Sequence, residues 1–122
     1  MNWFLLLFSG VAAIFIIRTL ILARPGISAE QARAVLNSGA AVLVDVREAG
    51  EWAGGTARHA ALLPLSDLRG ERTQWRAFLA KHKGKQLLLY CRSGSRSGMA
   101  AAQLRREGFN AVNAGSAGIW VQ

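Results

Sequence analysis

The chain is poor in the residues that build disulfides and metal sites. Its 122 residues include one cysteine, Cys91, and two histidines, His59 and His82. A single cysteine excludes an intramolecular disulfide and a zinc site of several cysteines, and two histidines give little support to any other metal site. Acidic residues are also scarce, 7 against 15 lysines and arginines, so the formal net charge is +8. We therefore expect no bound metal and no cofactor.

Hydrophobic residues are concentrated at the N-terminal end of the chain. The mean hydropathy of +0.21 is high for a soluble domain, and the excess lies in residues 3–23, which read WFLLLFSGVAAIFIIRTLILA. This length matches the about 20 residues that a helix needs to cross a bilayer core. Trp3 lies where an interfacial aromatic would lie, and Pro25-Gly26 ends the helix. We therefore predict a transmembrane anchor at residues 1–24 and a separate domain at residues 25–122.

Two alternatives to an anchor are a cleaved signal peptide and a buried core helix. A signal peptide needs a basic segment before the apolar run and small residues at a cleavage site, and the sequence offers neither. Basic residues lie at the C-terminal end of the run instead, at Arg18 and Arg24, and Arg33 follows. The positive-inside rule then predicts a single-pass protein of the inner (cytoplasmic) membrane whose domain faces the cytoplasm. A free cysteine suits that reducing compartment.

The domain itself is basic. Residues 27–122 hold 13 basic and 7 acidic residues, a net charge of +6. Such a charge attracts an anionic lipid surface, and nucleic acid is the other partner that it suggests. The sequence has no helix-turn-helix, zinc-finger or aromatic-interleaved basic pattern, so we expect no nucleic-acid partner.

Helical and strand patterns alternate along the domain. We predict helices at 29–36 with Ser28 as N-cap, from Ser66 or Gly70 to 83–84, and at 95–107 with Gly108 as C-cap, and strands at 41–46, 86–90 and 109–112. In the last helix we expect Met99, Ala102 and Leu104 to face inward. Strands that alternate with helices are typical of an α/β domain with a mainly parallel sheet.

The chemistry is concentrated around Cys91. The segment Tyr90-Cys91-Arg92-Ser93-Gly94-Ser95-Arg96-Ser97-Gly98 joins a buried strand to a helix. Backbone N–H groups of such a loop and the N-terminus of the following helix favour an anion, and two arginines add positive charge. We therefore predict that the pKa of Cys91 lies below that of a free thiol. A buried structural cysteine is the alternative.

The chain from Ile27 to Gln122 resembles the rhodanese (thiosulfate sulfurtransferase) family in its single-domain form. The resemblance rests on four ordered segments: DVRE at 45–48 followed by Glu51-Trp52, residues 55–65, the loop CRSGSR at 91–96, and residues 115–120. It implies a three-layer α/β domain with a small, mainly parallel sheet flanked by helices. Three positions depart from the family pattern: Thr56, Arg58-His59 and Ser116.

The resemblance also implies roles for individual residues. Cys91 would accept a sulfane sulfur and become a persulfide, surrounded by the backbone of the residues that follow it: Arg92, Ser93, Gly94, Ser95 and Arg96. The two arginines would bind an anionic donor, and the two serines could donate hydrogen bonds. Asp45 and Arg47 would be structural, as an ion pair that supports the loops near the site; direct contact with substrate is the alternative.

The implied reaction is a double displacement. Sulfur would pass from thiosulfate or a persulfide donor through Cys91 to cyanide, a small thiol or a protein thiol. Two other classes use the same features: a membrane-tethered binding module without catalysis, and an arsenate reductase or phosphatase. The second class usually has five residues between its cysteine and arginine, whereas four separate Cys91 from Arg96.

Overall fold

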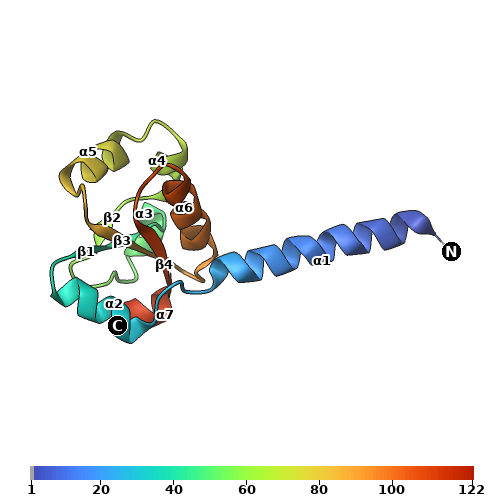
Figure 1. The fold of residues 1–122 in the computed structure, drawn as a ribbon, viewed down its shortest axis with the longest axis horizontal. Helices are drawn as coiled ribbons and strands as arrows, with labels where there is room; N and C mark the ends of the chain where they lie inside the picture. Colours follow the sequence, from blue (N-terminus) through green and yellow to red (C-terminus); the bar gives the residue numbers. More distant parts are fainter. Residues whose placement is uncertain (1) are drawn as a thin grey trace.

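A long N-terminal helix extends away from a small α/β domain in the computed structural model, which describes residues 2–122 (Figure 1). This helix, α1, runs from Trp3 to Ala23, as the apolar run predicted. Its large side chains are exposed, for example Phe4 at 82%, and none of its residues is buried. By length and composition α1 could cross a membrane. It contributes nothing to the core of the domain.

Four parallel strands form the sheet, in the order β2-β1-β3-β4. They are β1 (Ala41–Asp45), β2 (Ala61–Leu62), β3 (Gln86–Cys91) and β4 (Ala111–Ser116). The prediction of a small parallel sheet is confirmed. The chain leaves β1 toward one edge and leaves β3 toward the other, so the strand order reverses between β1 and β3. In open α/β sheets, ligands bind beyond the carboxyl ends of the strands at such a reversal.

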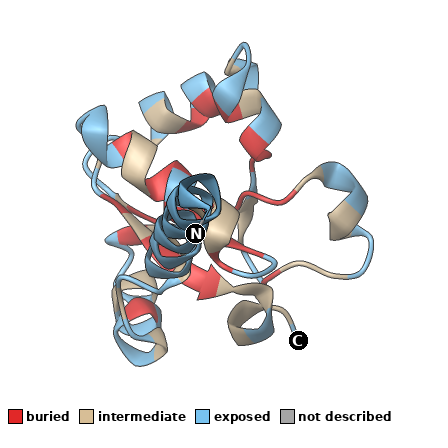
Figure 2. Cartoon of the chain, turned by 90° about the vertical axis from the view of Figure 1, so that its right-hand side faces the viewer, coloured by how far each residue is buried: buried red, intermediate tan, exposed pale blue. Residues whose placement is uncertain are grey.

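Helices cover both faces of the sheet and give three layers (Figures 1 and 2). One face carries α2 (Ala29–Asn37) and α7 (Ala117–Trp120); the other carries α4 (Leu65–Arg69), α5 (Thr73–Lys81) and α6 (Ser95–Arg106). Alternate β3 residues supply the two cores. Leu87 and Leu89 pack under α5 and α6, whereas Leu88 and Tyr90 pack toward α2. The remaining short helix, α3 (Ala49–Trp52), follows β1.

The start of α2 agrees with the sequence prediction. Ser28 accepts a hydrogen bond from the backbone N–H of Gln31 (3.1 Å), and the Gln31 side chain accepts one from the N–H of Ser28 (3.4 Å). This capping box satisfies two of the N–H groups that a helix start leaves without partners.

Of the two starts predicted for the next helix, the one at Gly70 lies near that of α5, and the one at Ser66 is wrong, because the stretch forms two helices, α4 and α5. The Asp67 carboxylate accepts a hydrogen bond from the backbone N–H of Trp75 (2.9 Å), which caps α5 from outside the helix. Arg72, just before α5, has a left-handed φ of 59°. A capping carboxylate from the preceding helix does not change the local hydrophobic periodicity, so the sequence pattern did not predict the break between the two helices.

Two other predictions need correction. The last strand is Ala111–Ser116, not 109–112, because its second half holds small and polar residues whose hydrogen bonds are made inside the protein. In α6, Leu104 is buried as predicted, but Met99 is 37% exposed. Met99 lies on the face of α6 that borders α1.

Candidate active site

The sole cysteine lies at the junction of β3 and α6. Cys91 is the last residue of the strand and is fully buried, while Gly94 is the N-cap of the helix. Gly94 has a φ of +93°, a conformation that glycine adopts without strain. The resulting tight loop returns the first turn of α6 over the sulfur. Sequence and fold thus place the thiol at the carboxyl edge of the sheet, beside the reversal of strand order.

Hydrogen-bond donors of the loop converge on the Cys91 sulfur. The backbone N–H groups of Gly94 and Ser97 donate to Sγ at 3.1 and 3.4 Å, and the Ser97 hydroxyl lies 3.4 Å from it. Burial raises the pKa of the thiol and is the largest single effect. Hydrogen bonds from the Ser97 hydroxyl and from loop N–H groups together outweigh burial, so the pKa lies below its ordinary value.

Two residues to which the sequence analysis assigned no role hold this loop in place. Ser97 is fully buried, and its hydroxyl lies 2.7 Å from Oδ1 of the buried Asn113 on β4. The Asn113 amide nitrogen donates to the Gly94 carbonyl (3.0 Å) and to the carbonyls of Leu22 and Arg24 (3.0 and 3.1 Å). Asn113 therefore connects the loop to the end of α1. Asn113 is far from its partners in sequence, so no local spacing could have indicated it, whereas Ser97 lies only six residues after Cys91.

The two arginines of the loop have different surroundings. Arg96 forms a two-point ion pair with Glu51 of α3, with both N–O distances 2.7 Å. Hydrogen bonding to Arg96 lowers the pKa of Glu51 to about 2, and the same pair raises the pKa of Arg96. Arg92 is exposed and forms no ion pair within residues 2–122. That both arginines bind an anionic donor stays a prediction; Arg96 has a carboxylate partner, whereas Arg92 has none within the described residues.

The serines of the loop face each other at its surface. The hydroxyls of Ser93 and Ser95 lie 3.0 Å apart. Neither hydroxyl contacts the sulfur in the described structure, so the direct contacts to Sγ come from backbone N–H groups and Ser97.

Asp45 and Arg47 form a buried pair at the carboxyl end of β1. The Arg47 guanidinium donates to both Asp45 oxygens and to the Gly55 carbonyl (2.7 Å). The Tyr90 hydroxyl donates to Asp45 (2.7 Å) and accepts from the backbone N–H of Ala57 (2.9 Å). Burial is the main cause that raises the pKa of Tyr90 to about 12. This network connects β1, β3 and the 55–57 loop. The polar atoms of its side chains form hydrogen bonds within the protein, which agrees with a structural role.

The departures from the family pattern lie in turns and at the sheet edge. His59 is exposed and has a φ of +63°, so it fills a turn position that favours glycine. Thr56 lies in the same loop and is half-buried. Ser116, opposite Cys91 in the register of β3 and β4, is the N-cap of α7. Among residues 2–122 no three His, Cys, Asp or Glu side chains are grouped as metal ligands.

Comparison with known proteins places this geometry in a family. Residues 28–119 match the family model described as "Rhodanese-like domain". Among solved structures, a rhodanese-related protein from Thermoplasma volcanium has a TM-score of 0.62 and 26% identity, with 76% of this chain and 85% of that chain covered. The human single-domain sulfurtransferase TSTD1 has a TM-score of 0.60 and 32% identity, with 76% and 91% covered.

Curated relatives are larger proteins. An uncharacterised protein of Synechocystis is 41% identical over 73 residues, 60% of this chain and 37% of that protein. A tRNA uridine(34) hydroxylase of Enterobacter is 29% identical over 86 residues, 70% of this chain and 25% of that enzyme. The chain thus spans between a quarter and two fifths of these two relatives. The family match and the shared fold together show that the chain belongs to the rhodanese-like domain family.

Proposed function

We propose that this protein is a sulfurtransferase that carries a sulfane sulfur as a persulfide on Cys91. The observation that supports this most strongly is the buried thiol with a lowered pKa, surrounded by N–H donors at the N-terminus of α6. Such donors stabilise a thiolate, and they also stabilise the negative terminal sulfur of a persulfide. The resemblance to a human single-domain sulfurtransferase supports the same reaction class.

In the first step the Cys91 thiolate attacks the outer sulfur of thiosulfate or of a persulfide. A new S–S bond forms to Cys91, the old S–S bond of the donor breaks, and its electron pair leaves with sulfite or with a thiolate. No external oxidant or reductant is required. The exposed Arg92 is the loop cation that could attract the anionic donor without first losing a carboxylate partner.

In the second step a thiolate or cyanide attacks the terminal sulfur of the Cys91 persulfide. The acceptor gains that sulfur, and the electron pair of the broken S–S bond returns to Cys91 as a thiolate. The donors around Sγ hold negative charge at the start and end of the cycle, so the loop need not rearrange to stabilise it. A small thiol, a protein thiol and cyanide all fit this chemistry.

The loop fits phosphate or arsenate less well. Enzymes that attack these oxyanions hold them with the arginine at the end of the loop, and here Arg96 is paired with Glu51 at 2.7 Å. The four residues between Cys91 and Arg96 also make a smaller ring than the usual five. The smaller ring favours transfer of a single sulfur atom.

We also propose that α1 crosses the inner membrane once and that the domain faces the cytoplasm. The helix has 21 residues, a mean hydropathy of 2.4 and no buried residue. Basic residues lie only at its domain end and beyond it, which favours retention of that side in the cytoplasm.

The persulfide is tested by intact mass spectrometry of the full chain in mild detergent after incubation with thiosulfate. We expect a gain of one sulfur atom that a reducing agent removes and that Cys91→Ser abolishes. Cys91→Ser replaces only the sulfur, and circular dichroism shows whether the variant is folded. A mass gain in Cys91→Ser, or none in the wild-type chain with either thiosulfate or glutathione persulfide, would overturn the proposal; assays with arsenate and phosphoesters would follow.

A further inference from the structure

A groove of about 420 Å³ lies between α1 and α6, next to the active-site loop. Its walls are one face of each helix. On α1 the lining residues recur every three to four positions, at Phe15, Arg18, Thr19 and Leu22; on α6 they are Ser95, Met99, Ala102, Gln103 and Arg106, and Arg69 of α4 completes the groove. This spacing is that of a single helix face. The groove is therefore a continuous surface made by two helices, not a gap between loops.

The lining combines apolar side chains with positive charge. Phe15, Leu22 and Met99 supply apolar surface, while three arginines supply charge: Arg18, Arg69 and Arg106. No acidic residue lines the groove. The ion pairs of the described chain use other arginines (Arg47, Arg72 and Arg96), so these three keep their charges unneutralised within residues 2–122. An occupant with a negative head and an apolar tail would match both properties.

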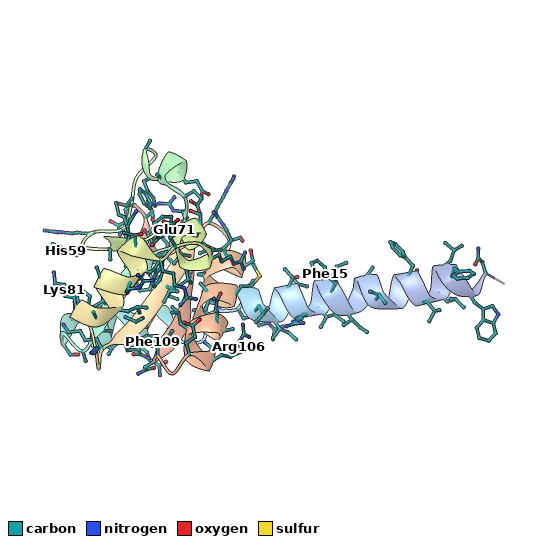
Figure 3. The ribbon with its side chains drawn as sticks, turned by 90° about the horizontal axis from the view of Figure 1, so that it is seen from above. Phe15, His59, Glu71, Lys81, Arg106 and Phe109 are labelled. Carbon is teal, nitrogen blue, oxygen red and sulfur yellow. The ribbon has the colours of Figure 1, made fainter. Side chains whose placement is uncertain are left out.

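The long side chain of Arg18 can reach the headgroup layer of a membrane from within the apolar run. Arg18 precedes the end of α1 at Ala23 by five residues, which is about 7.5 Å along a helix axis. An arginine this near the end of a membrane helix extends its side chain toward the headgroups while its backbone stays in the apolar layer. Arg106, at the last residue of α6, lies near the domain end of α1 (Figure 3). If α1 spans the bilayer, the guanidinium groups of the three arginines reach the level of lipid phosphates, and Phe15 lies deeper, at the level of acyl chains.

Specific contacts hold the end of α1 against the domain, and these contacts set the orientation of α1 relative to α6. Asn113 donates to the carbonyls of Leu22 and Arg24. Gly98 of α6 lies so close to α1 that an added Cβ would be 1.7 Å from the Leu22 carbonyl oxygen. The two walls therefore keep a defined separation.

We propose that this groove binds one anionic phospholipid, with its phosphate between the three arginines and its acyl chain along the apolar face of α1. The proposal rests on the membrane-spanning position of α1 proposed above, and it is independent of the sulfur chemistry. A neutral lipid would leave the three charges without a partner. An acidic peptide would not reach Phe15, which lies in the apolar layer. The lipid site would place Ser95, and with it the active-site loop, at the membrane surface.

Native mass spectrometry of the full chain in mild detergent tests the site. Phosphatidylglycerol and phosphatidylcholine with identical chains serve as probes. We expect one phosphatidylglycerol per chain, bound at least tenfold more tightly than phosphatidylcholine. Arg69→Gln and Arg106→Gln should each weaken it about fivefold, because a basic residue near a lipid headgroup contributes about that factor.

Arg76→Gln is the matched control. It removes an exposed arginine from α5, outside the groove, and should leave lipid binding unchanged. An equal loss in Arg76→Gln would overturn the proposal in favour of general surface attraction. Equal binding of free glycerol phosphate would show a soluble phosphate site instead, and a chain dimer that excludes lipid would show that a second α1 fills the groove.

Discussion

At the scale of single residues, the chemistry of the site depends on hydrogen bonds to Sγ more than on nearby charge. The causes that lower the pKa of Cys91 most are the Ser97 hydroxyl and the backbone N–H groups of the loop. The Ser97 hydroxyl has one proton and three acceptors within reach: Asn113 Oδ1 at 2.7 Å, the Gly94 carbonyl at 3.1 Å and Sγ at 3.4 Å. A thiolate is a stronger acceptor than a thiol, so deprotonation of Cys91 should draw this proton toward the sulfur.

Ser97→Ala should raise the pKa of Cys91. The substitution removes a donor that stabilises the charged form and keeps the backbone N–H of residue 97. Because the wild-type pKa is lowered, the thiolate fraction at neutral pH should fall in the variant. A pH titration of thiolate absorbance in the ultraviolet measures the midpoint. Ser93→Ala is the control, since the Ser93 hydroxyl contacts Ser95 and not Sγ. An unchanged midpoint in Ser97→Ala would show that the Ser97 hydroxyl donates to Asn113 Oδ1, and not to Sγ, in both protonation states of Cys91.

Glu51→Gln should improve the use of thiosulfate. Glu51 occupies both terminal nitrogens of Arg96, and the neutral amide would release that charge for the donor. A unit charge about 4 Å away is worth about 1 kcal/mol in water, so KM for thiosulfate should fall about fivefold. Steady-state kinetics with thiosulfate measures this.

Glu107→Gln is the matched control for Glu51→Gln. Glu107 forms the same two-point ion pair with Arg72, at 2.6 and 2.9 Å, but at the opposite end of α6. Its removal should leave KM unchanged. A higher KM in Glu51→Gln would contradict the prediction and would show that Glu51 positions the loop and does not compete with the donor.

The sequence could predict the part of the site that is contiguous. Cys91 and the loop to Arg96 follow one another between a strand and a helix, so their proximity needed no knowledge of the fold. Glu51 was part of the segment that carried the family resemblance, but the spacing along the chain does not show that it forms an ion pair with Arg96. Asn113 was missed because its role arises from the pairing of β4 beside β3, whereas Ser97 lies only six residues after Cys91 and was missed because the family motif ends at Arg96.

At the scale of elements, two glycines allow α1 to contact α6. Gly94 and Gly98 are four residues apart and face successive carbonyl groups of α1. An added Cβ would lie 2.5 Å from the Ala23 oxygen at Gly94, and 1.7 Å from the Leu22 oxygen at Gly98. Small residues at this spacing are typical of helices that approach one another closely. The loop that holds the sulfur therefore also receives the end of the apolar helix.

Gly98→Ala should separate α1 from the domain. Alanine stabilises a helix by about 1 kcal/mol relative to glycine. Faster hydrogen exchange in this variant would therefore come from the steric clash with α1 and not from a weaker helix α6. The backbone N–H of Gly26 donates to the Asn113 carbonyl at 2.8 Å and reports on this junction. We expect hydrogen exchange at Gly26 to become at least about tenfold faster. Asn113 would lose the two hydrogen bonds that it donates to Leu22 and Arg24, and each contributes about 1 kcal/mol.

Gly10→Ala is the control for the clash. It lies on the same helix α1, and an added Cβ there meets no atom within 4 Å. Exchange at Gly26 should be unchanged in this variant. If Gly98→Ala also left exchange unchanged, the contact between α1 and α6 would not hold the junction together.

Elements with a strong local pattern were predicted well, and those set by tertiary contacts were not. β1 and β3 are continuous apolar runs, and Ser28 caps α2 by a local rule, so their places could be read from the chain. The break between α4 and α5 depends on Asp67, and β4 depends on the buried amide of Asn113. The prediction that Met99 faces the core was wrong because the sequence pattern does not distinguish a helix face toward the core from one that borders α1.

At the scale of the whole molecule, charge and hydropathy are separated along the chain. The apolar helix α1 holds one basic residue, Arg18, and the rest of the net charge lies from Arg24 onward. The groove arginines lie on the side of the domain toward α1. A basic face next to the anionic inner surface of a membrane is held there by about 1 kcal/mol per basic residue. The same attraction opposes transfer of the domain across the bilayer.

The domain should therefore remain in the cytoplasm. A fluorescent protein fused after Gln122 should fluoresce in bacterial cells and fractionate with the membrane, whereas alkaline phosphatase at the same position should be inactive, because it needs an oxidising compartment to form its disulfides. The matched variant replaces Arg18 and Arg24 with Gln and adds lysines before Trp3, which should reverse both readouts by the positive-inside rule. Active phosphatase on the unaltered chain would place the domain outside the cytoplasm. Cys91 would then lie where no glutathione keeps its thiol reduced between turnovers, and the acceptor would have to be supplied on that side of the membrane.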